Sequence, residues 1–474
     1  MSTNYTPTEK IPSLVESLHK EFNTGLTKDV KFRKQQLKNL LRFFEENTKA
    51  IEQALWNDLH KHQMETDVGE VSLVVDEAKY MLNNLDKFVK PKYTKKRFLM
   101  NTTDKTYIRK EAKGVVLVSQ HTAEMVASIL PKYLDSRAYT VITGGVKETT
   151  TVLEQRFDHI FYTGNGAVGK IVMTAAAKHL TSVTLELGGK SPAFVASDAD
   201  IKLTAHRLLW GKFFNCGQTC VAPDYVLCAK DKTDELIKAF RETLQEFYGN
   251  DAKKSNSYGR IINTRQFDRL KGLLDNCRKE TIVIGGDSSR EDLFMAPTVI
   301  YPVATSDGNL MQDEIFGPIL PVIPVENMKE AIQIVNSRDH SLALYVFSSK
   351  KTTYNNILDH TNSGGVLIND TLMHLQELSL PFGGVGPSGM GSYHGEMSFN
   401  TFTHERSTMV KDTAMENVVS VRYPPYNQDK ANVLSALVYG FPGAFGTKIS
   451  SLVTVCGSMW RFLTSKNKNM DKQV

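Results

Sequence analysis

The chain has 474 residues, 41% of them hydrophobic and 23% charged, so it is too long for one ordinary domain and typical of a soluble globular protein with two or three. This composition excludes a disordered, collagen-like or coiled-coil protein. The net charge of +5 is small and dispersed, and five cysteines do not form a disulfide framework. We therefore expect no nucleic-acid partner and a reducing compartment.

The first ninety residues are predicted to be helical, and a polar arm is predicted to follow. Apolar residues recur at helical spacing, which predicts helices over residues 9–55 and 63–89. Residues 90–110 are basic, polar and contain a proline, which indicates an exposed arm or hairpin. The first ten residues are polar, so we expect no secretory signal.

Apolar strands then alternate with helices, the pattern of parallel β/α units. The first series predicts strands over 114–118, 139–143 and 159–162 and helices over 122–134 and 168–180. The second predicts helices over 202–214, 234–248 and 328–336 and strands over 225–229, 281–284 and 343–347. We therefore expect an α/β protein with two doubly wound parallel-sheet domains that meet near residue 187.

Two segments contain candidate catalytic residues. In FNCGQTC (214–220), a thiol after Gly-Gln-Thr could lie where backbone N–H groups lower its pKa and bind an oxyanion. The alternative is a buried structural cysteine, and a zinc site is disfavoured because the cysteine spacing is wrong and no histidine is near. In ELGGKSP (186–192), Glu186 ends an apolar strand before two glycines and could act as a general base, or could be a solvated turn residue.

Three glycine-containing segments are candidates for ligand contacts. Gly164, Gly166 and Gly169 have the G-x-G-x-x-G spacing at a strand-to-helix junction, which could present a helix N-terminus to a dinucleotide phosphate. In EIFGP (314–318), Glu314 and Phe316 could hold a ribose hydroxyl and a flat ring. The loop PFGGVGPSGMG (381–391) precedes His394, a weaker candidate base than Glu186. Tight glycine-rich connections are the alternative for all three.

Taken together and in this order, these segments resemble the aldehyde dehydrogenase superfamily, in its class 3 and fatty aldehyde dehydrogenase branch. The similarity runs from about residue 30 to about 425 and includes SGGVLIND and SFNTFTH. It implies that Cys220 is the nucleophile and that Glu186 activates the water that hydrolyses the thioester. It also implies an NAD or NADP site formed by Gly164, Asn165, Gly166, Ala167, Val168, Gly169, Glu314 and Phe316. No metal is expected.

One departure from the family pattern follows Val118. The family has an Asn-aromatic-Pro loop, a helix and a strand ending in Lys-Pro-Ser-Glu after this position, whereas here Val118 leads directly into Ser119. About thirty residues, the size of a βαβ piece, are missing. No residue can be assigned as the oxyanion asparagine or as the Lys and Glu that contact the adenosine ribose. We therefore expect impaired cofactor binding and low activity, or an incomplete gene model or splice form of an active enzyme.

The C-terminal region is predicted to associate with a membrane surface. Ile449, Leu452, Val453, Cys456, Met459, Trp460 and Leu463 share one face of an amphipathic helix, and a lysine-rich tail follows. Neither this helix nor residues 433–447 reaches the roughly 20 apolar residues of a spanning helix. The alternative is a helix that packs on a partner subunit or caps a pocket. The resemblance to tail-anchored members implies the cytosolic face of the endoplasmic reticulum, the mitochondrial outer membrane or a lipid droplet.

The expected organisation follows from these segments. Residues 1–95 and 114–186 form a shortened cofactor domain, 187–395 the catalytic domain, 96–113 and 396–425 the oligomerisation segments, and 426–474 the tail. The expected function is NAD(P)-dependent oxidation of long-chain aldehydes by a homodimer. Oxidation of aromatic or medium-chain aldehydes is one alternative. A catalytically impaired form that only dimerises or binds membrane is the other.

Overall fold

The structure is a computed structural model of the 474-residue chain. It describes the chain except residues 1–4, 97–100, 119–126, 415, 440–444 and 471–474. The chain forms two compact units. The first comprises Met1–Asp86 and Ala112–Thr403, and the second Lys87–Glu111 and His404–Val474.

The N-terminal helices confirm the predicted helical region but divide it into shorter elements. Helix α1 (Ile11–Thr24) ends at Gly25, whose φ of 88° is the left-handed conformation that glycine adopts at helix ends. Asp29 then caps α2 (Val30–Leu59) by accepting from the N–H of Lys31. A short α3 (Gln63–Thr66), a π-helical turn (Asp67–Val71) and α4 (Ser72–Phe88) follow. The helical stretch predicted over residues 9–55 is interrupted at residues 25–29, where Gly25, a 3₁₀ turn (Leu26–Lys28) and Asp29 separate α1 from α2.

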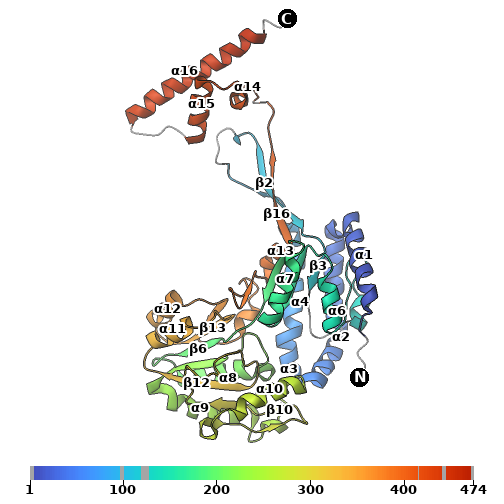
Figure 1. The fold of residues 1–474 in the computed structure, drawn as a ribbon, viewed down its shortest axis with the longest axis vertical. Helices are drawn as coiled ribbons and strands as arrows, with labels where there is room; N and C mark the ends of the chain where they lie inside the picture. Colours follow the sequence, from blue (N-terminus) through green and yellow to red (C-terminus); the bar gives the residue numbers. More distant parts are fainter. Residues whose placement is uncertain (1–4, 97–100, 119–126, 415, 440–444, 471–474) are drawn as a thin grey trace. The chain divides into compact units, whose positions relative to one another are not determined.

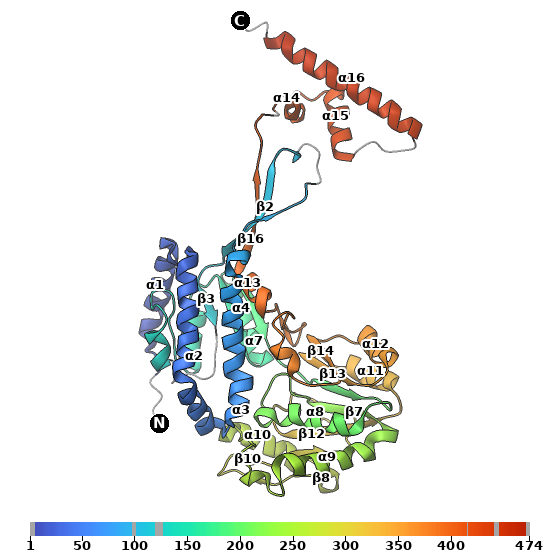
Figure 2. The ribbon, with the colours of Figure 1, turned by 180° about the vertical axis from the view of Figure 1, so that it is seen from behind.

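The cofactor-side sheet has four strands in the order β15-β5-β4-β3. Strands β3 (Val116–Val118), β4 (His159–Thr163) and β5 (Ser182–Glu186) are parallel, and β15 (Gly389–Met390) pairs antiparallel with β5. Helices α6 (Val146–Leu153) and α7 (Gly166–Ala177) connect to this sheet and lie beside it in Figures 1 and 2. The predicted helix over 122–134 begins among residues that the structure does not describe, and its last residues form a short 3₁₀ turn, Leu130–Lys132.

The strand predicted over residues 139–143 is absent, and the missing segment explains why. Thr143 instead pairs with the N-terminal segment, donating its N–H to Thr6 Oγ1 at 3.0 Å and accepting the N–H of Thr6 at 2.8 Å. In a doubly wound sheet of order 3-2-1-4-5, the third strand pairs with the second. The family pattern places that second strand directly after Val118, where this sequence has no counterpart, and residues 139–143 pair with no strand among the described residues.

The catalytic-side sheet has seven strands in the order β14-β13-β6-β7-β12-β11-β8, all parallel except β8. Its helices lie on both faces, as expected of a doubly wound sheet (Figures 1 and 2). The strands are β6 (Pro192–Val195), β7 (Tyr225–Ala229), β8 (Ile282–Ile284), β11 (Thr298–Ile300), β12 (Ile319–Val325), β13 (Ala343–Phe347) and β14 (Gly365–Ile368). The helices are α8 (Ile201–Phe213), α9 (Thr233–Tyr248), α10 (Thr264–Asp275), α11 (Met328–Asn336) and α12 (Lys351–His360).

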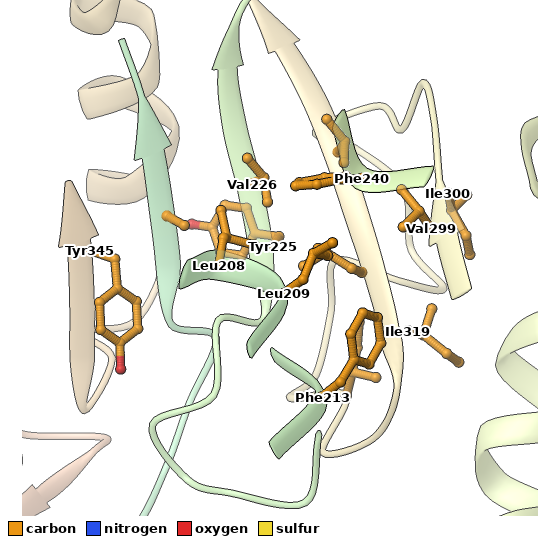
Figure 3. Packing of buried hydrophobic residues seen from close by; sticks show 14 of the residues in the cluster. Leu208, Leu209, Phe213, Tyr225, Val226, Phe240, Val299, Ile300, Ile319 and Tyr345 are labelled. Carbon is orange, nitrogen blue, oxygen red and sulfur yellow. The ribbon is translucent and has the colours of Figure 1, made fainter. Parts of the chain in front are cut away.

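The main hydrophobic core belongs to this second sheet. Leu208, Leu209 and Phe213 of α8 are buried among the apolar side chains of the central strands, as Figure 3 shows. Strand β7 is buried at every residue, which is the expected pattern for a parallel strand covered on both faces. This rigid core holds the residues between α8 and β7, where Cys220 lies.

The second unit contains an antiparallel arm and a helical C-terminal region. Strand β1 (Lys92–Tyr93) pairs with β2 (Lys105–Ala112), and β16 (Thr403–Val410) completes the sheet β1-β2-β16, so the predicted arm is confirmed. Helix α13 (Gly395–Thr401) leads into β16. After α14 (Glu416–Val419), α15 (Gln428–Tyr439) packs on α16 (Phe445–Met470) around Val433 and Phe462.

Helix α16 contains the predicted amphipathic segment, but it packs on α15 through a different face. Ser458, predicted on the polar face, is fully buried, and its hydroxyl lies 3.3 Å from the side-chain amide of Asn432. Val453 and Trp460, predicted on the apolar face, are 67% and 68% exposed. The side chain of Ile449 lies outside the described residues. Within the described part of the chain, no helix is both long and apolar enough to cross a bilayer.

Candidate active site

Cys220 lies in the connection between α8 and β7, after a 3₁₀ turn at Phe214–Gly217. Its side chain is half-buried, whereas that of Cys216, four residues earlier, is fully buried. The hydroxyl of Tyr345 on β13 donates to the backbone carbonyl of Val221 at 2.5 Å and so fixes the backbone beside the thiol. The structure therefore makes Cys220 the accessible thiol of this segment and Cys216 the structural one.

The pKa of the Cys220 thiol is raised rather than lowered, which corrects the expectation from the sequence. Burial raises this pKa to about 12, and the negative charges of Glu314 and Glu186 add to the effect. The backbone N–H groups of Cys220 and Val221 act in the opposite direction but do not outweigh burial. The thiol is therefore neutral at pH 7 in this state and needs a base, or a positive charge nearby, to become a nucleophile.

Glu186 ends β5 and is buried, with 2% of its surface exposed, so it is not a solvated turn residue. Neither of its carboxylate oxygens has a hydrogen-bond partner among the described residues. Burial raises its pKa to about 8, which places it near the range that suits a general base at physiological pH. An unpaired buried carboxylate is costly in a folded protein, which is typical of a functional position.

The glycine-containing junction is next to Glu186. The N–H of Gly164 donates to the backbone carbonyl of Glu186 at 3.0 Å, so the end of β5 and the turn after β4 are joined directly. Asn165 caps α7 by accepting the N–H of Val168 at 2.9 Å. The N–H groups of Gly166 and Ala167 are in the first turn of α7 and have no intrahelical acceptor. Gly169 packs closely on Leu187.

Glu314 lies against Gly188, two residues after Glu186 in the sequence, and Phe316 follows in the same segment. A Cβ atom at Gly188 would be 2.5 Å from a carboxylate oxygen of Glu314, so this glycine is needed for the close approach. Burial raises the pKa of Glu314 to about 8, and the negative charge of Glu314 raises the pKa of the Cys220 thiol. The side chain of Phe316 is 38% exposed, and its φ of 47° places it in the left-handed region. The structure therefore brings Cys220, Glu186 and Glu314 into one electrostatically coupled group.

Asp224 is a central residue that the sequence analysis missed. Its carboxylate accepts from Lys190 Nζ at 2.5 Å and from the backbone N–H of Ile315 at 3.0 Å. Its backbone N–H donates to the carbonyl of Ser191. These contacts join the segments of Glu186, Cys220 and Glu314. Lys190 lies inside ELGGKSP and Asp224 lies four residues after Cys220. They are 34 residues apart in the sequence, and no spacing rule pairs them.

Lys212 is a second residue without a sequence signal. It is fully buried on α8, and its Nζ has no hydrogen-bond partner within the described ranges. Burial lowers its pKa to about 8, and the charges of Asp224 and Glu314 oppose this change. Its helical spacing is that of a core position, where a lysine is unexpected.

His394, the weaker candidate base, packs among aromatic side chains. The ring of His394 stacks on Phe382 at a centroid distance of 5.1 Å, and the backbone N–H of His394 donates to Ser398 Oγ. Burial lowers the pKa of His394. The adjacent Tyr393, by contrast, has its pKa raised by burial and by the charges of Glu186 and Cys220, so it lies beside the candidate site.

The residues present fit a dinucleotide in part. The first-turn N–H groups of α7 and the open space at Gly166 suit a pyrophosphate, because no atom lies within 4 Å of a Cβ placed there. Glu314 is a hydrogen-bond acceptor for a ribose, and the exposed ring of Phe316 can pack on a nicotinamide. The adenosine half has fewer candidates, since the residues that would follow β3 are missing.

Residues 118–408 match the aldehyde dehydrogenase family. Aldehyde dehydrogenase family 3 member A2 of Rattus norvegicus is 42% identical over 450 residues, covering 88% of this chain and 92% of its own. The chain belongs to the aldehyde dehydrogenase family and is an aldehyde dehydrogenase by sequence and fold. It is a member of the class 3 branch, as further relatives with the same family number show.

Two further comparisons support this assignment. The dimeric NADP-preferring aldehyde dehydrogenase of Canis lupus familiaris is 42% identical over 448 residues, covering 88% of this chain and 98% of its own. The substrate-bound structure of AldH from Staphylococcus aureus superposes with a TM-score of 0.87 at 38% identity, covering 90% of this chain and 99% of that one. The predicted α/β fold with two doubly wound sheets is therefore confirmed.

The alignment also agrees with a missing internal segment. Of the 474 residues, 88% is about 417, which is about 33 fewer than the 450 positions aligned with the rat relative. This shortfall has the size of the unit expected after Val118. It also agrees with a sheet in which, among the described residues, β3 pairs with β4 alone.

Proposed function

We propose that this protein oxidises long-chain aldehydes to carboxylic acids, with NAD or NADP as the hydride acceptor. The observation that carries the proposal is the accessible thiol of Cys220 coupled to Glu186, a buried carboxylate without a partner among the described residues. When bound at the junction of α7 and beside Glu314 and Phe316, the dinucleotide supplies the acceptor for the hydride of the aldehyde carbon.

The protein's own residues perform the covalent steps. The thiol of Cys220 adds to the aldehyde, so that the sulfur bonds to the carbon and the proton ends on the former carbonyl oxygen as a thiohemiacetal. Loss of the hydride to the bound acceptor and of that proton to solvent leaves a thioester. Glu186 then takes a proton from water as the water oxygen attacks the thioester carbon. The carbon–sulfur bond breaks, the acid leaves and the thiol is restored. The backbone N–H of Cys220 is one donor for the oxyanion.

A chain-length series tests the proposed substrate class. We expect kcat/KM for NAD(P)H formation to rise from short to long saturated aldehydes, by up to about fourfold for each methylene that becomes buried. Benzaldehyde is the comparison for the aromatic alternative. A higher kcat/KM for benzaldehyde than for the long-chain substrates would replace the fatty class by the aromatic one.

We further propose that the second unit associates with an intracellular membrane at its cytosolic face. Counted from the sequence, residues 87–111 and 404–474 contain 18 Lys and Arg but 7 Asp and Glu, so this unit carries a net charge of +11. Exposed Leu452, Val453, Trp460 and Leu463 form an apolar face on α16. This combination is typical of a helix that lies in the interface of an anionic membrane.

Vesicle flotation tests the membrane proposal. The full chain is expected to float with vesicles that contain an anionic phospholipid, and the double substitution Val453→Ser and Trp460→Ser should reduce the bound fraction about tenfold. Thr454→Ser on the same helix is the matched control. Equal flotation of the double variant and the control would contradict the role of this face.

The same unit supports the proposed homodimer. Strands β1 and β16 are the outer strands of β1-β2-β16, and a second copy could extend this sheet at an edge. The relative from Canis lupus familiaris is described as dimeric. The endoplasmic reticulum, the mitochondrial outer membrane and the lipid droplet are the proposed locations.

The impaired form is the second candidate function, favoured by the sheet that ends at β3. A chain that lacks one oxyanion donor is expected to be slower by roughly 10²–10³-fold. Inserting the corresponding segment of a class 3 relative after Val118 should therefore raise kcat by this factor and tighten NAD binding. A repaired protein with unchanged turnover and cofactor affinity would refute the impairment.

A further inference from the structure

The turn that leads to Cys220 is held in an unusual backbone conformation. Asn215, Cys216 and Gly217 have φ values of 52°, 55° and 75°, so three consecutive residues are left-handed and only the last is a glycine. Residues other than glycine adopt this region only when their surroundings impose it. The contacts that impose it therefore help to determine where the thiol of Cys220 lies.

Part of this support comes from loops of the catalytic domain, at Gln218 and at residues 260–262. Gln218 donates from its side chain to the carbonyl of Arg260 at 2.9 Å and accepts the N–H of Ile262 at 3.0 Å. The side-chain amide of Asn215 donates to the carbonyl of Gln218 at 2.8 Å. These bonds hold the end of the turn. The backbone N–H of Asn215, at the start of the turn, has its acceptor outside these loops.

The start of the turn is held by the N-terminal helical region. The N–H of Asn215, the first left-handed residue, donates to a carboxylate oxygen of Glu65 on α3 at 3.1 Å. The π-helical turn that follows α3 packs on the neighbouring ring, because a Cβ at Gly69 would be 2.6 Å from Phe214. Lys61 Nζ lies 5.3 Å from the centroid of the same ring. Residues 61–71 thus enclose the start of the turn from outside the catalytic sheet.

We propose that Glu65 is a positioning residue for Cys220, whose carboxylate holds the N–H of Asn215 and whose protonation loosens the turn that carries the thiol. A carboxylate accepts a stronger hydrogen bond than the neutral acid does. Loss of the charge therefore weakens the hydrogen bond between Glu65 on α3 and the start of the turn. The inference rests on the proposed role of Cys220 as the nucleophile.

The burial of Glu65 places this change near neutral pH. Burial raises its pKa to about 7, opposed by the N–H of Asn215 and by the charge of Lys61. Lys61 is itself paired with Glu70 at 2.6 Å, which reduces its effect on Glu65. The other titratable groups that face Glu65 are Cys216 and Tyr248, whose pKa values its negative charge raises further.

Alkylation of Cys220 across pH tests the proposal. The rate with iodoacetamide is followed by mass spectrometry of the peptide that contains Cys220, in the unaltered protein and in Glu65→Gln, whose amide oxygen still accepts but does not titrate. The ratio of the two rates cancels the titration of Cys220, Glu186 and Glu314, which both proteins share. We expect this ratio to change about fivefold in a single step near pH 7.

Glu45→Gln is the matched control, because it removes an exposed carboxylate from α2, whereas Glu70 pairs with the Lys61 that acts on Glu65. The ratio of the unaltered rate to the Glu45→Gln rate should be flat through pH 7. A flat ratio for Glu65→Gln, or an equal step for Glu45→Gln, would overturn the proposal.

Hydrogen exchange of the peptide around Asn215 gives a second measurement without a variant. After correction for the intrinsic pH dependence of exchange, protection should decrease below pH 7, and constant protection would overturn the proposal. Neither experiment uses an aldehyde or a cofactor. An inactive enzyme would therefore refute the proposed function without affecting this test.

Discussion

Replacement of Cys220 by alanine is expected to remove NAD(P)H formation from a long-chain aldehyde almost completely, by roughly 10⁶-fold. The covalent route needs a nucleophile that reaches the aldehyde carbon, and Cys220 is the half-buried thiol of its segment, next to a fully buried Cys216. The initial rate at saturating aldehyde and cofactor measures the loss.

Cys277→Ala is the matched control for this substitution. Cys277 is also half-buried, but it lies in a different part of the chain, just after α10. Its thiol donates to the backbone carbonyl of Leu273. Activity should be unchanged in this variant. If Cys220→Ala kept a tenth or more of the activity in folded protein, covalent catalysis through this residue would be excluded.

Glu186→Gln is expected to reduce steady-state turnover by roughly 10²–10⁴-fold, because the amide cannot take the proton of the attacking water. In the unaltered protein the base must be ionised, and burial raises its pKa to about 8. The hydrolytic step should therefore become faster as pH rises, reach half its maximum near pH 8 and level off above that value. The pH dependence of kcat measures this step when hydrolysis limits turnover.

The exposed Glu377 offers a control of the same residue type, and Glu377→Gln should retain both the rate and the pH profile. In Glu186→Gln the dependence on an ionisation near pH 8 should be lost. A Glu186→Gln enzyme with the unaltered rate and profile would show that another group activates the water.

Local patterns predicted the elements of the catalytic domain well. The structure gives strands β7 and β13 and helix α11 the predicted bounds. A strand buried on both faces has a continuous apolar run, and a helix packed on a core has a clear apolar periodicity, so both are easy to recognise in the sequence. The segment 139–143 has the same apolar character but forms no strand. A strand needs a neighbour, and the local apolar pattern of residues 139–143 does not register the loss of the family strand expected after Val118.

The candidate site was predicted through its motifs, while its supporting contacts were not. Cys220, Glu186 and Glu314 were recognisable because each lies in a motif with family resemblance. Asp224 and Lys190 come together only through the packing of loops distant in the sequence. The raised pKa of Cys220 also depends on burial and on two neighbouring carboxylates, which no local pattern measures.

The C-terminal helix shows the same limit. Its periodicity predicted a helix correctly, yet it could not tell which face packs on α15. Ser458 is buried because Asn432 bonds to it, while Trp460 remains exposed. A hydroxyl with a buried partner can occupy an interface that hydropathy alone assigns to apolar residues.

Trapping of the acyl-enzyme tests the proposed mechanism most directly. Glu186→Gln protein is incubated with a long-chain aldehyde and NAD, and its peptides are then analysed by mass spectrometry. If Cys220 captures the aldehyde and hydrolysis is blocked, the peptide that contains Cys220 should be heavier by the mass of the fatty acyl group. One equivalent of NADH should be released per active site. Peptides free of the adduct despite NADH release, or an adduct on another cysteine, would contradict it.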